Sequence, residues 1–128
     1  MLTHITIGAV DKAAGAAFYE AVLGPLGYSR AFDTDRWTGL SCGEGQPPVL
    51  VGTPFNDEPA SAANGLMVGF SAESRAKVKE AYDAGLKAGG TDDGPPGPRP
   101  AGPPNTYAAY LRDPTGNKVG FFCMAEGE

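Results

Sequence analysis

His4, the only histidine of the 128-residue chain, is the side chain best suited to acid–base or metal chemistry. An imidazole changes charge near neutral pH and is a common metal ligand. His4 also precedes a run of residues that favours a strand, where its nitrogens could simply bond backbone groups or water. The two cysteines, Cys42 and Cys123, lie far apart without a CxxC spacing. They are expected to be buried reduced thiols, and neither a disulfide framework nor a zinc site is indicated.

Four further side chains are candidates for contact with a small ligand. Tyr107 and Tyr110 lie on one expected strand, and because odd and even positions face opposite ways, at most one of them faces a cleft directly. Packing in the core or on the surface is the other interpretation of each. Arg99 stands among prolines, where it could close over an anionic or carbonyl-bearing ligand or remain solvated. Trp37 is interpreted as a cleft wall, an interface anchor or a core residue.

Several classes of protein are excluded by what the sequence lacks. There is no Gly-Lys-Ser/Thr phosphate loop, no GxGxxG after a strand and no serine nucleophile elbow, so nucleotide cofactors, kinases and hydrolases are not supported. The acidic residues near Asp33 and Asp57 fit turns, and their spacing does not suggest a catalytic carboxylate pair. A net charge of -5 without Lys/Arg clusters argues against nucleic acid as a partner.

The size and hydrophobicity of the chain predict one compact domain spanning residues 1–128. A length of 128 residues with 41% hydrophobic content supports one ordinary core. No apolar run approaches the roughly 20 residues of a membrane span, and the start of the chain does not resemble a secretory signal. We therefore expect a cytoplasmic protein that makes no membrane contact.

An internal repeat determines how these side chains are positioned. Sliding the chain by 63 residues aligns the runs 4–7 and 67–70, Tyr19 with Tyr82, and Gly27 with Gly90. Each half therefore shows the order strand, helix and glycine stop. The two halves are residues 1–56 and 65–125, joined by a linker over 56–64.

The expected elements give a β-α-β-β-β order twice. Asp11 is a suitable N-cap for a helix over 12–23 that ends at Gly24-Pro25, and Ser71 or Ser74 can cap a second helix that reaches Ala88 and stops at Gly89-Gly90. Strands are expected over 4–7, 28–33, 36–42, 48–53, 66–71, near Thr91, over 107–112 and over 118–124. Residues 92–105 are rich in proline and glycine and are expected to form a long loop. The fold class is therefore α+β.

The segment 107–122 contains the most specific motif. Two strand-forming runs flank Asp113-Pro114-Thr115-Gly116-Asn117, in which Pro114 presets φ for a turn and Gly116 can adopt positive φ. With the repeat and the opening run from His4, this motif resembles the vicinal oxygen chelate superfamily, which includes glyoxalase I, extradiol dioxygenases and bleomycin resistance proteins. The resemblance is closest to small bacterial glyoxalase-like proteins. It implies two βαβββ units whose curved mixed sheet surrounds a ligand cleft.

The resemblance also implies where metal ligands would lie. Metal-dependent relatives carry them on the first and last strands of each unit, which here correspond to His4, residues 49–51, Met67 and Gly120. Residues 49–51 are apolar, a thioether is a poor ligand for hard divalent ions, and glycine has no side chain. Only His4 remains as a candidate metal ligand, so no metal is expected and a divalent ion stays as the alternative.

These inferences lead to one main hypothesis and two alternatives. The main hypothesis is a superfamily member with a degenerate metal site that binds a small organic molecule in its cleft. The alternatives are a metal-dependent lactoylglutathione lyase-like lyase or isomerase, or extradiol-type dioxygenase, and a non-catalytic structural or regulatory dimer module. A homodimer is expected, since relatives usually dimerise. Catalytic residues are not assigned; the candidate ligand-binding residues are His4, Trp37, Met67, Arg99, Tyr107, Tyr110 and Gly120.

Overall fold

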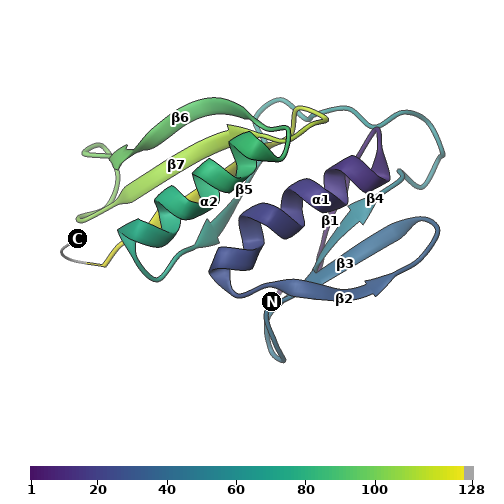
Figure 1. Ribbon diagram of the computed structural model, residues 1–128, viewed down its shortest axis with the longest axis horizontal. Helices are drawn as coiled ribbons and strands as arrows, with labels where there is room; N and C mark the ends of the chain where they lie inside the picture. Colours follow the sequence, from purple (N-terminus) through teal and green to yellow (C-terminus); the bar gives the residue numbers. More distant parts are fainter. Residues whose placement is uncertain (126–128) are drawn as a thin grey trace.

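The computed structural model describes residues 1–125 and contains two four-stranded sheets and two α-helices (Figure 1). The first unit runs in the order β1 (Ile5–Gly8), α1 (Lys12–Leu23), a 3-10 turn (Gly24–Leu26), β2 (Ser29–Asp33), β3 (Trp37–Ser41) and β4 (Val49–Gly52). The second unit follows in the order β5 (Met67–Ser71), α2 (Arg75–Lys87), β6 (Thr91–Pro98), β7 (Tyr107–Arg112) and β8 (Lys118–Cys123). The predicted fold class, α+β with two βαβββ units, is confirmed.

Each unit forms its own mixed sheet, and the two sheets have the same topology. The strand orders are β1-β4-β3-β2 and β5-β8-β7-β6. In both units the first strand pairs in parallel with the last, and the other neighbours are antiparallel. Strands β1 and β5 are therefore edge strands of separate sheets, and a seam lies between the units at these edges.

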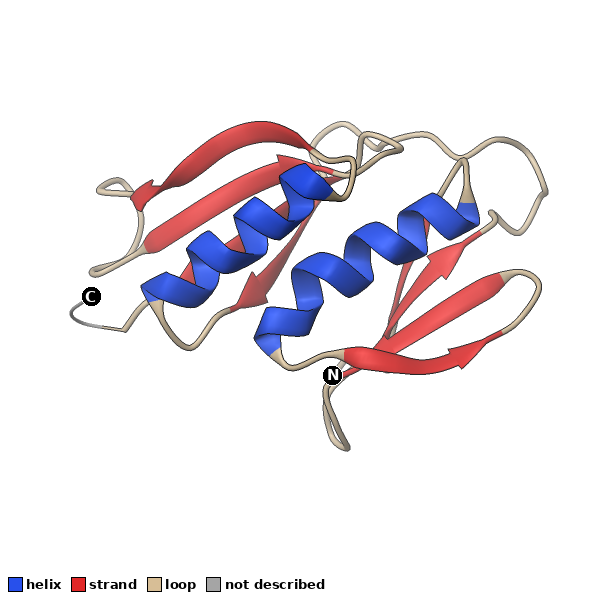
Figure 2. Ribbon diagram, viewed as in Figure 1, coloured by secondary structure: helices blue, strands red, loops and turns tan. Residues whose placement is uncertain are grey.

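The two helices lie side by side on one side of the sheets (Figure 2). Val22 of α1 is fully buried and approaches Gly85 of α2, where an added Cβ would lie 2.9 Å from the valine methyl and 2.3 Å from Leu111. A glycine at this position lets the helices approach closely. Beneath them, alternate strand residues such as Val49, Val51, Val119 and Phe121 are buried with at most 1% exposure. The opposite side of each sheet, which faces away from the helices, is called the open face below.

The predicted helix caps are present. Asp11 accepts a hydrogen bond from the Ala14 backbone N–H at 3.1 Å through its carboxylate, and α1 starts at Lys12. In the second unit Ser74, one of the two predicted caps, accepts from the Lys77 N–H at 3.1 Å. These bonds satisfy donors that a helix start leaves free, and they explain why both helices begin where the sequence predicts.

The prediction of a long loop over residues 92–105 was wrong in its first half, because residues 91–98 form the edge strand β6. Proline lacks an N–H donor, but an edge strand needs its donors on one side only. The strand also has two register irregularities: Gly94 pairs with Tyr110 and Gly97 with Ala108, while the two prolines between these glycines have no register partner on β7. The loop is therefore confined to residues 99–106.

The cysteine prediction was correct for one residue only. Cys123 is buried on β8, whereas Cys42 follows β3 and is exposed; both are free. Burial and a hydrogen bond with Cys42 raise the pKa of Tyr28 to about 12.

None of the helices among residues 1–125 combines the length and apolar character needed to cross a bilayer.

Candidate ligand-binding site

A buried carboxylate, Asp113, organises the hairpin that the sequence singled out. One carboxylate oxygen accepts hydrogen bonds from the backbone N–H groups of Thr115, Gly116 and Asn117 at 2.9, 2.9 and 3.0 Å. The other accepts from the Asn117 side-chain amide at 2.9 Å. Gly116 has φ of 104°, as a turn of this kind requires. Asp113 is 6% exposed, so these bonds replace water around the carboxylate.

The same carboxylate joins the two units. The Tyr19 hydroxyl, on α1 of unit one, donates to Asp113 at 2.7 Å in a buried bond. Asn117 donates to the Gly8 carbonyl at 2.9 Å, and the Val10 backbone N–H donates to the Thr115 hydroxyl at 2.9 Å. Burial, and then the nearby Asp113 carboxylate, raise the pKa of Tyr19 well above its usual value. The hairpin of unit two is therefore fixed onto unit one.

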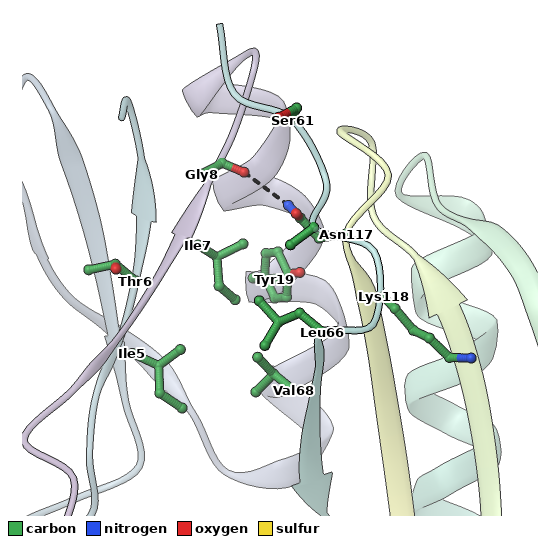
Figure 3. A pocket seen from close by; sticks show the side chains of 11 residues that line it. Ile5, Thr6, Ile7, Gly8, Tyr19, Ser61, Leu66, Val68, Asn117 and Lys118 are labelled. Carbon is green, nitrogen blue, oxygen red and sulfur yellow. Dashed lines mark hydrogen bonds between the residues drawn. The ribbon is translucent and has the colours of Figure 1, made fainter. Parts of the chain in front are cut away.

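A pocket of about 200 Å³ occupies the seam beside this network (Figure 3). Its walls are the apolar side chains of Ile5 and Ile7 from β1 and of Leu66 and Val68 across the gap, and Tyr19 lies between them. The rest of the lining consists of Thr6, Gly8, Ser61, Ala63, Asn117 and Lys118. This seam pocket is smaller than the roughly 300–1,000 Å³ of drug-sized ligand sites, so it suits a small apolar group.

The open face of unit two carries a partly exposed aromatic pair. Tyr110 and Phe122 lie with ring centroids 5.7 Å apart at an interplanar angle of 74°, an edge-to-face arrangement. The rings lie directly over Gly120, where an added Cβ would be 2.7 Å from Phe122 and 3.2 Å from Tyr110. The Met67 sulfur is 3.2 Å from the same point, and Met67 is 38% exposed. Three predicted ligand-binding positions, Met67, Tyr110 and Gly120, therefore meet on one surface.

Cations flank this aromatic pair. The Lys118 ammonium lies 5.0 Å and the Arg99 guanidinium carbon 5.1 Å from the centroid of the Tyr110 ring. Asp93 binds Lys118 at 3.3 Å and Arg112 at 3.1 Å, so one carboxylate is shared by two cations. Lys118 also lines the seam pocket, and Met67 stands between the two lining residues Leu66 and Val68. The open face and the pocket are therefore neighbouring surfaces.

The protein itself supplies hydrogen-bond partners to Arg99, which the sequence left either closing over a ligand or solvated. Its guanidinium donates to the carbonyls of Pro95, Gly97 and Pro98 at 2.7, 2.9 and 3.2 Å. All three carbonyls belong to the irregular strand β6, which ends directly before Arg99. Arg99 therefore shapes the edge of the open face and is not a free arm.

The remaining predicted residues lie elsewhere. Tyr107 is buried on the opposite side of β7 from Tyr110, where the Arg75 guanidinium lies 4.9 Å from its ring. Trp37 is half-buried at the start of β3, against Gly52 in unit one. His4 is exposed just before β1, and its Nδ1 lies 3.0 Å from the Thr3 hydroxyl. None of these three residues lines the seam pocket or the open face of unit two.

Sequence reasoning missed Lys118, Phe122, Asp113 and Asn117 as site residues. The first two could have been found from strand alternation, since they share the face of Gly120 on β8. The roles of Asp113 and Asn117 depend on Tyr19 and Gly8, which lie far away in the sequence. Within residues 1–125, His, Cys, Asp and Glu side chains do not gather in threes at a place that could hold a metal ion.

Both the sequence and the fold match known proteins. The Glyoxalase/Bleomycin resistance protein/Dioxygenase superfamily model matches residues 1–121. A crystal structure of a glyoxalase/bleomycin resistance protein from Albidiferax ferrireducens T118 is 33% identical, with a TM-score of 0.85 over 96% of this chain and 98% of that one. The chain therefore belongs to the Glyoxalase/Bleomycin resistance protein/Dioxygenase superfamily.

More distant structures share the fold. A glyoxalase-related enzyme from Fulvimarina pelagi is 18% identical, with a TM-score of 0.77 over 96% of this chain and 87% of that one. A lactoylglutathione lyase from Agrobacterium tumefaciens is 22% identical, with a TM-score of 0.64 over 96% and 92%. No curated protein is similar in sequence to this chain.

Proposed function

We propose that this protein binds a small organic molecule on the open face of unit two without a metal ion. The observation that carries the proposal is the partly exposed pair Tyr110 and Phe122 over Gly120, with Met67 beside it. Aromatic rings and a thioether offer a polarizable surface for a planar or apolar ligand. An adjoining pocket of about 200 Å³ has room for a small apolar substituent of the same ligand.

The side chains at the family's metal positions support the metal-free part of the proposal. On β4, Val49 and Val51 are buried in the core and Leu50 is the residue on the other face. On β5 and β8 the positions hold Met67 and Gly120, which lie together. A divalent ion needs several fixed oxygen, nitrogen or thiolate donors to offset its dehydration, and His4 alone does not supply them. These residues do not fit a catalytic metal.

The cations around Tyr110 support a preference among ligands. Lys118 and Arg112 share only Asp93, so this edge of the open face carries an excess of positive charge. A ligand that combines an aromatic ring with a carbonyl or an anionic group would therefore be favoured over a cationic one. The net charge of -5 belongs to the whole chain, whereas this preference is local.

We also infer a homodimer. Phe32 of unit one lies over Gly39 on the open face of that unit and is 42% exposed. A second copy would bury this side chain. Analytical ultracentrifugation at micromolar concentration tests this inference: a single species of about twice the 13.1 kDa chain mass is expected, and a monomer contradicts it.

A ligand panel on chelator-treated protein tests the function. We expect aromatic carboxylates to raise the melting temperature more than aromatic amines or aliphatic acids, because they combine a ring with an anionic group. A ligand present at 100 times its Kd should stabilise the folded protein by about 2.7 kcal/mol. Tyr110→Leu should reduce the shift, while Phe55→Leu, which changes an aromatic residue exposed outside the site, should keep it. Stabilisation only with added Ni, Zn, Fe(II) or Mn would favour the metal-dependent alternative. No stabilising compound at all would favour the structural module.

A further inference from the structure

Arg75, the first residue of α2, has a side chain that the fold does not fully satisfy. Its Nε is buried, and no group among residues 1–125 accepts a hydrogen bond from it. The guanidinium carbon lies 4.9 Å from the centroid of the Tyr107 ring, which stabilises the charge but accepts no conventional hydrogen bond. Buried polar groups nearly always have a partner, so this donor calls for an explanation.

Other arginines of the chain show what is missing. Arg36 binds the Asp57 carboxylate at 2.9 Å and a backbone carbonyl at 2.7 Å. The Arg112 Nε donates to Asp93 at 3.1 Å, and Arg99 donates to three backbone carbonyls. The buried Nε of Arg75 therefore contrasts with arginines whose donors reach an oxygen of the protein.

A hollow lies beside Arg75, at the end of the β6–β7 hairpin. Its volume is about 290 Å³, close to the lower end of small-molecule sites. Arg75, Arg99 and Asn105 line it, together with the rings of prolines 98, 100, 103 and 104. None of its lining residues is acidic. The space is thus bounded by two cations, a side-chain amide and rigid apolar rings.

We propose that this hollow binds a small organic oxyanion, a carboxylate or a phosphate, through the guanidinium of Arg75. Two oxygens of such a group match the planar fork of an arginine, which forms short charge-assisted hydrogen bonds with them. The bound oxyanion supplies the acceptor that Arg75 lacks, and the proline rings contact the apolar part of the ligand. The hollow lies at the start of α2. Arg99 lines it and also flanks Tyr110 at the open face, so the test follows Arg75, which contacts Tyr107 and is not part of the open face.

NMR of the ¹⁵N-labelled protein tests the proposal, because the Arg75 Nε–H signal reports on the proposed donor. Sodium phosphate, acetate and benzoate are titrated at constant ionic strength, with sodium chloride as the reference. We expect saturable shifts of Arg75 and of the Asn105 and Thr106 amides. Phosphate acting alone would identify a phosphate site, and tighter binding of benzoate than of acetate would identify an aryl carboxylate site.

Two variants and a control complete the experiment. Arg75→Met should weaken binding at least about tenfold, the loss expected for charge-assisted hydrogen bonds. Arg75→Lys keeps the charge without the planar fork and should bind with intermediate affinity. Lys87→Met removes an exposed charge from the other end of α2 and should bind normally. Linear shifts equal to those in sodium chloride, or equal binding by wild type and Arg75→Lys, would overturn the proposal; if Arg75→Met does not fold, these two comparisons decide.

Discussion

Tyr19 and Tyr82 occupy equivalent positions on α1 and α2, yet their hydroxyl groups bind aspartates in different surroundings. Tyr19 is 1% exposed and donates at 2.7 Å to the buried Asp113 of the other unit. Tyr82 donates at 2.8 Å to the exposed Asp92, which lies ten residues further along its own unit. One bond joins the units and the other stays at the surface. The two tyrosines therefore occupy equivalent positions in their units but have different roles.

The hairpins of the two units differ in the same way. The β7–β8 turn reaches unit one through the bonds from Asn117 to Gly8 and from Val10 to Thr115. The corresponding β3–β4 connection, residues 42–48, is mostly exposed. Only the turn of unit two is built around a buried carboxylate. The comparison predicts that substitutions in the buried network around Asp113, which joins the units, affect the whole molecule more than substitutions at the Tyr82–Asp92 pair.

Removal of the Asp113 carboxylate should have the largest effect. Asp113→Ala leaves three backbone N–H groups, the Asn117 amide and the Tyr19 hydroxyl without their acceptor, so we expect a loss of about 3–5 kcal/mol in the free energy of unfolding. Urea unfolding followed by circular dichroism measures it. Asp92→Ala is the matched control and should cost clearly less; equal losses would refute the difference between the two aspartates.

A substitution that gives α2 the residue found at the equivalent position of α1 should have the next largest effect. Gly85 is equivalent to Val22 of α1, and the Cβ added by Gly85→Val would lie 2.3 Å from the Leu111 side chain. Overpacking of this kind costs about 1–3 kcal/mol, or prevents native packing. Gly24→Ala, at a helical φ of -53° with nothing within 4 Å, is the control and should leave the melting temperature nearly unchanged. A stable Gly85→Val variant would mean that the helices can separate without cost.

Loss of single hydroxyl groups tests the tyrosines directly. Tyr19→Phe removes a buried donor from Asp113, and we expect a loss of about 1–3 kcal/mol in unfolding free energy. Tyr82→Phe breaks a bond to an exposed carboxylate and should shift the melting temperature less. Differential scanning calorimetry compares the two. The same shift for both variants would show that the buried bond has no special value.

The pH dependence of stability should follow Tyr19 at the alkaline end. Its pKa in the folded protein is raised by burial and by Asp113, so the unfolded chain loses this proton first. The stability that the Tyr19 hydroxyl contributes is therefore fully present below the unfolded tyrosine pKa of about 10, and it is lost as the pH rises above that value. Unfolding between pH 9 and 12 should be less pH-dependent in Tyr19→Phe than in the wild type. An unchanged slope would contradict the assignment.

Local features of the fold were well predicted from the sequence. Asp11, Ser74 and the glycine stops act over a few residues, so the sequence alone sufficed to locate both helices. Only the start of β6, near Thr91, was predicted; the rest of the strand was missed because its pairing depends on β7, whose backbone accepts a partner despite the prolines. Local propensity alone does not report such tertiary support.

The candidate site was predictable only in part. Met67, Tyr110 and Gly120 meet as neighbours on adjacent strands, and family position with strand alternation indicated them. Arg99 was also predicted and lies beside these residues. Its guanidinium donates to carbonyls of β6, which the irregular geometry of that strand places within hydrogen-bond distance. The other predicted residues lie away from this surface: His4, Trp37 and Tyr107. Their neighbours depend on the register of the sheets and on the seam between the units.

The central claim, ligand binding at unit two without a metal, is tested most directly by methyl NMR of the methionines. The chain has three, of which Met67 lies over Gly120 on the open face of unit two, so ¹³C-methyl labelling gives a reporter there and a control in Met1 at the exposed start of the chain. The best ligand of the panel is titrated into chelator-treated protein and again after addition of Ni, Zn, Fe(II) or Mn. We predict a saturable shift of Met67 with the same Kd in both titrations. A shift that appears only with metal, or ligand binding that leaves Met67 unchanged, would contradict the account.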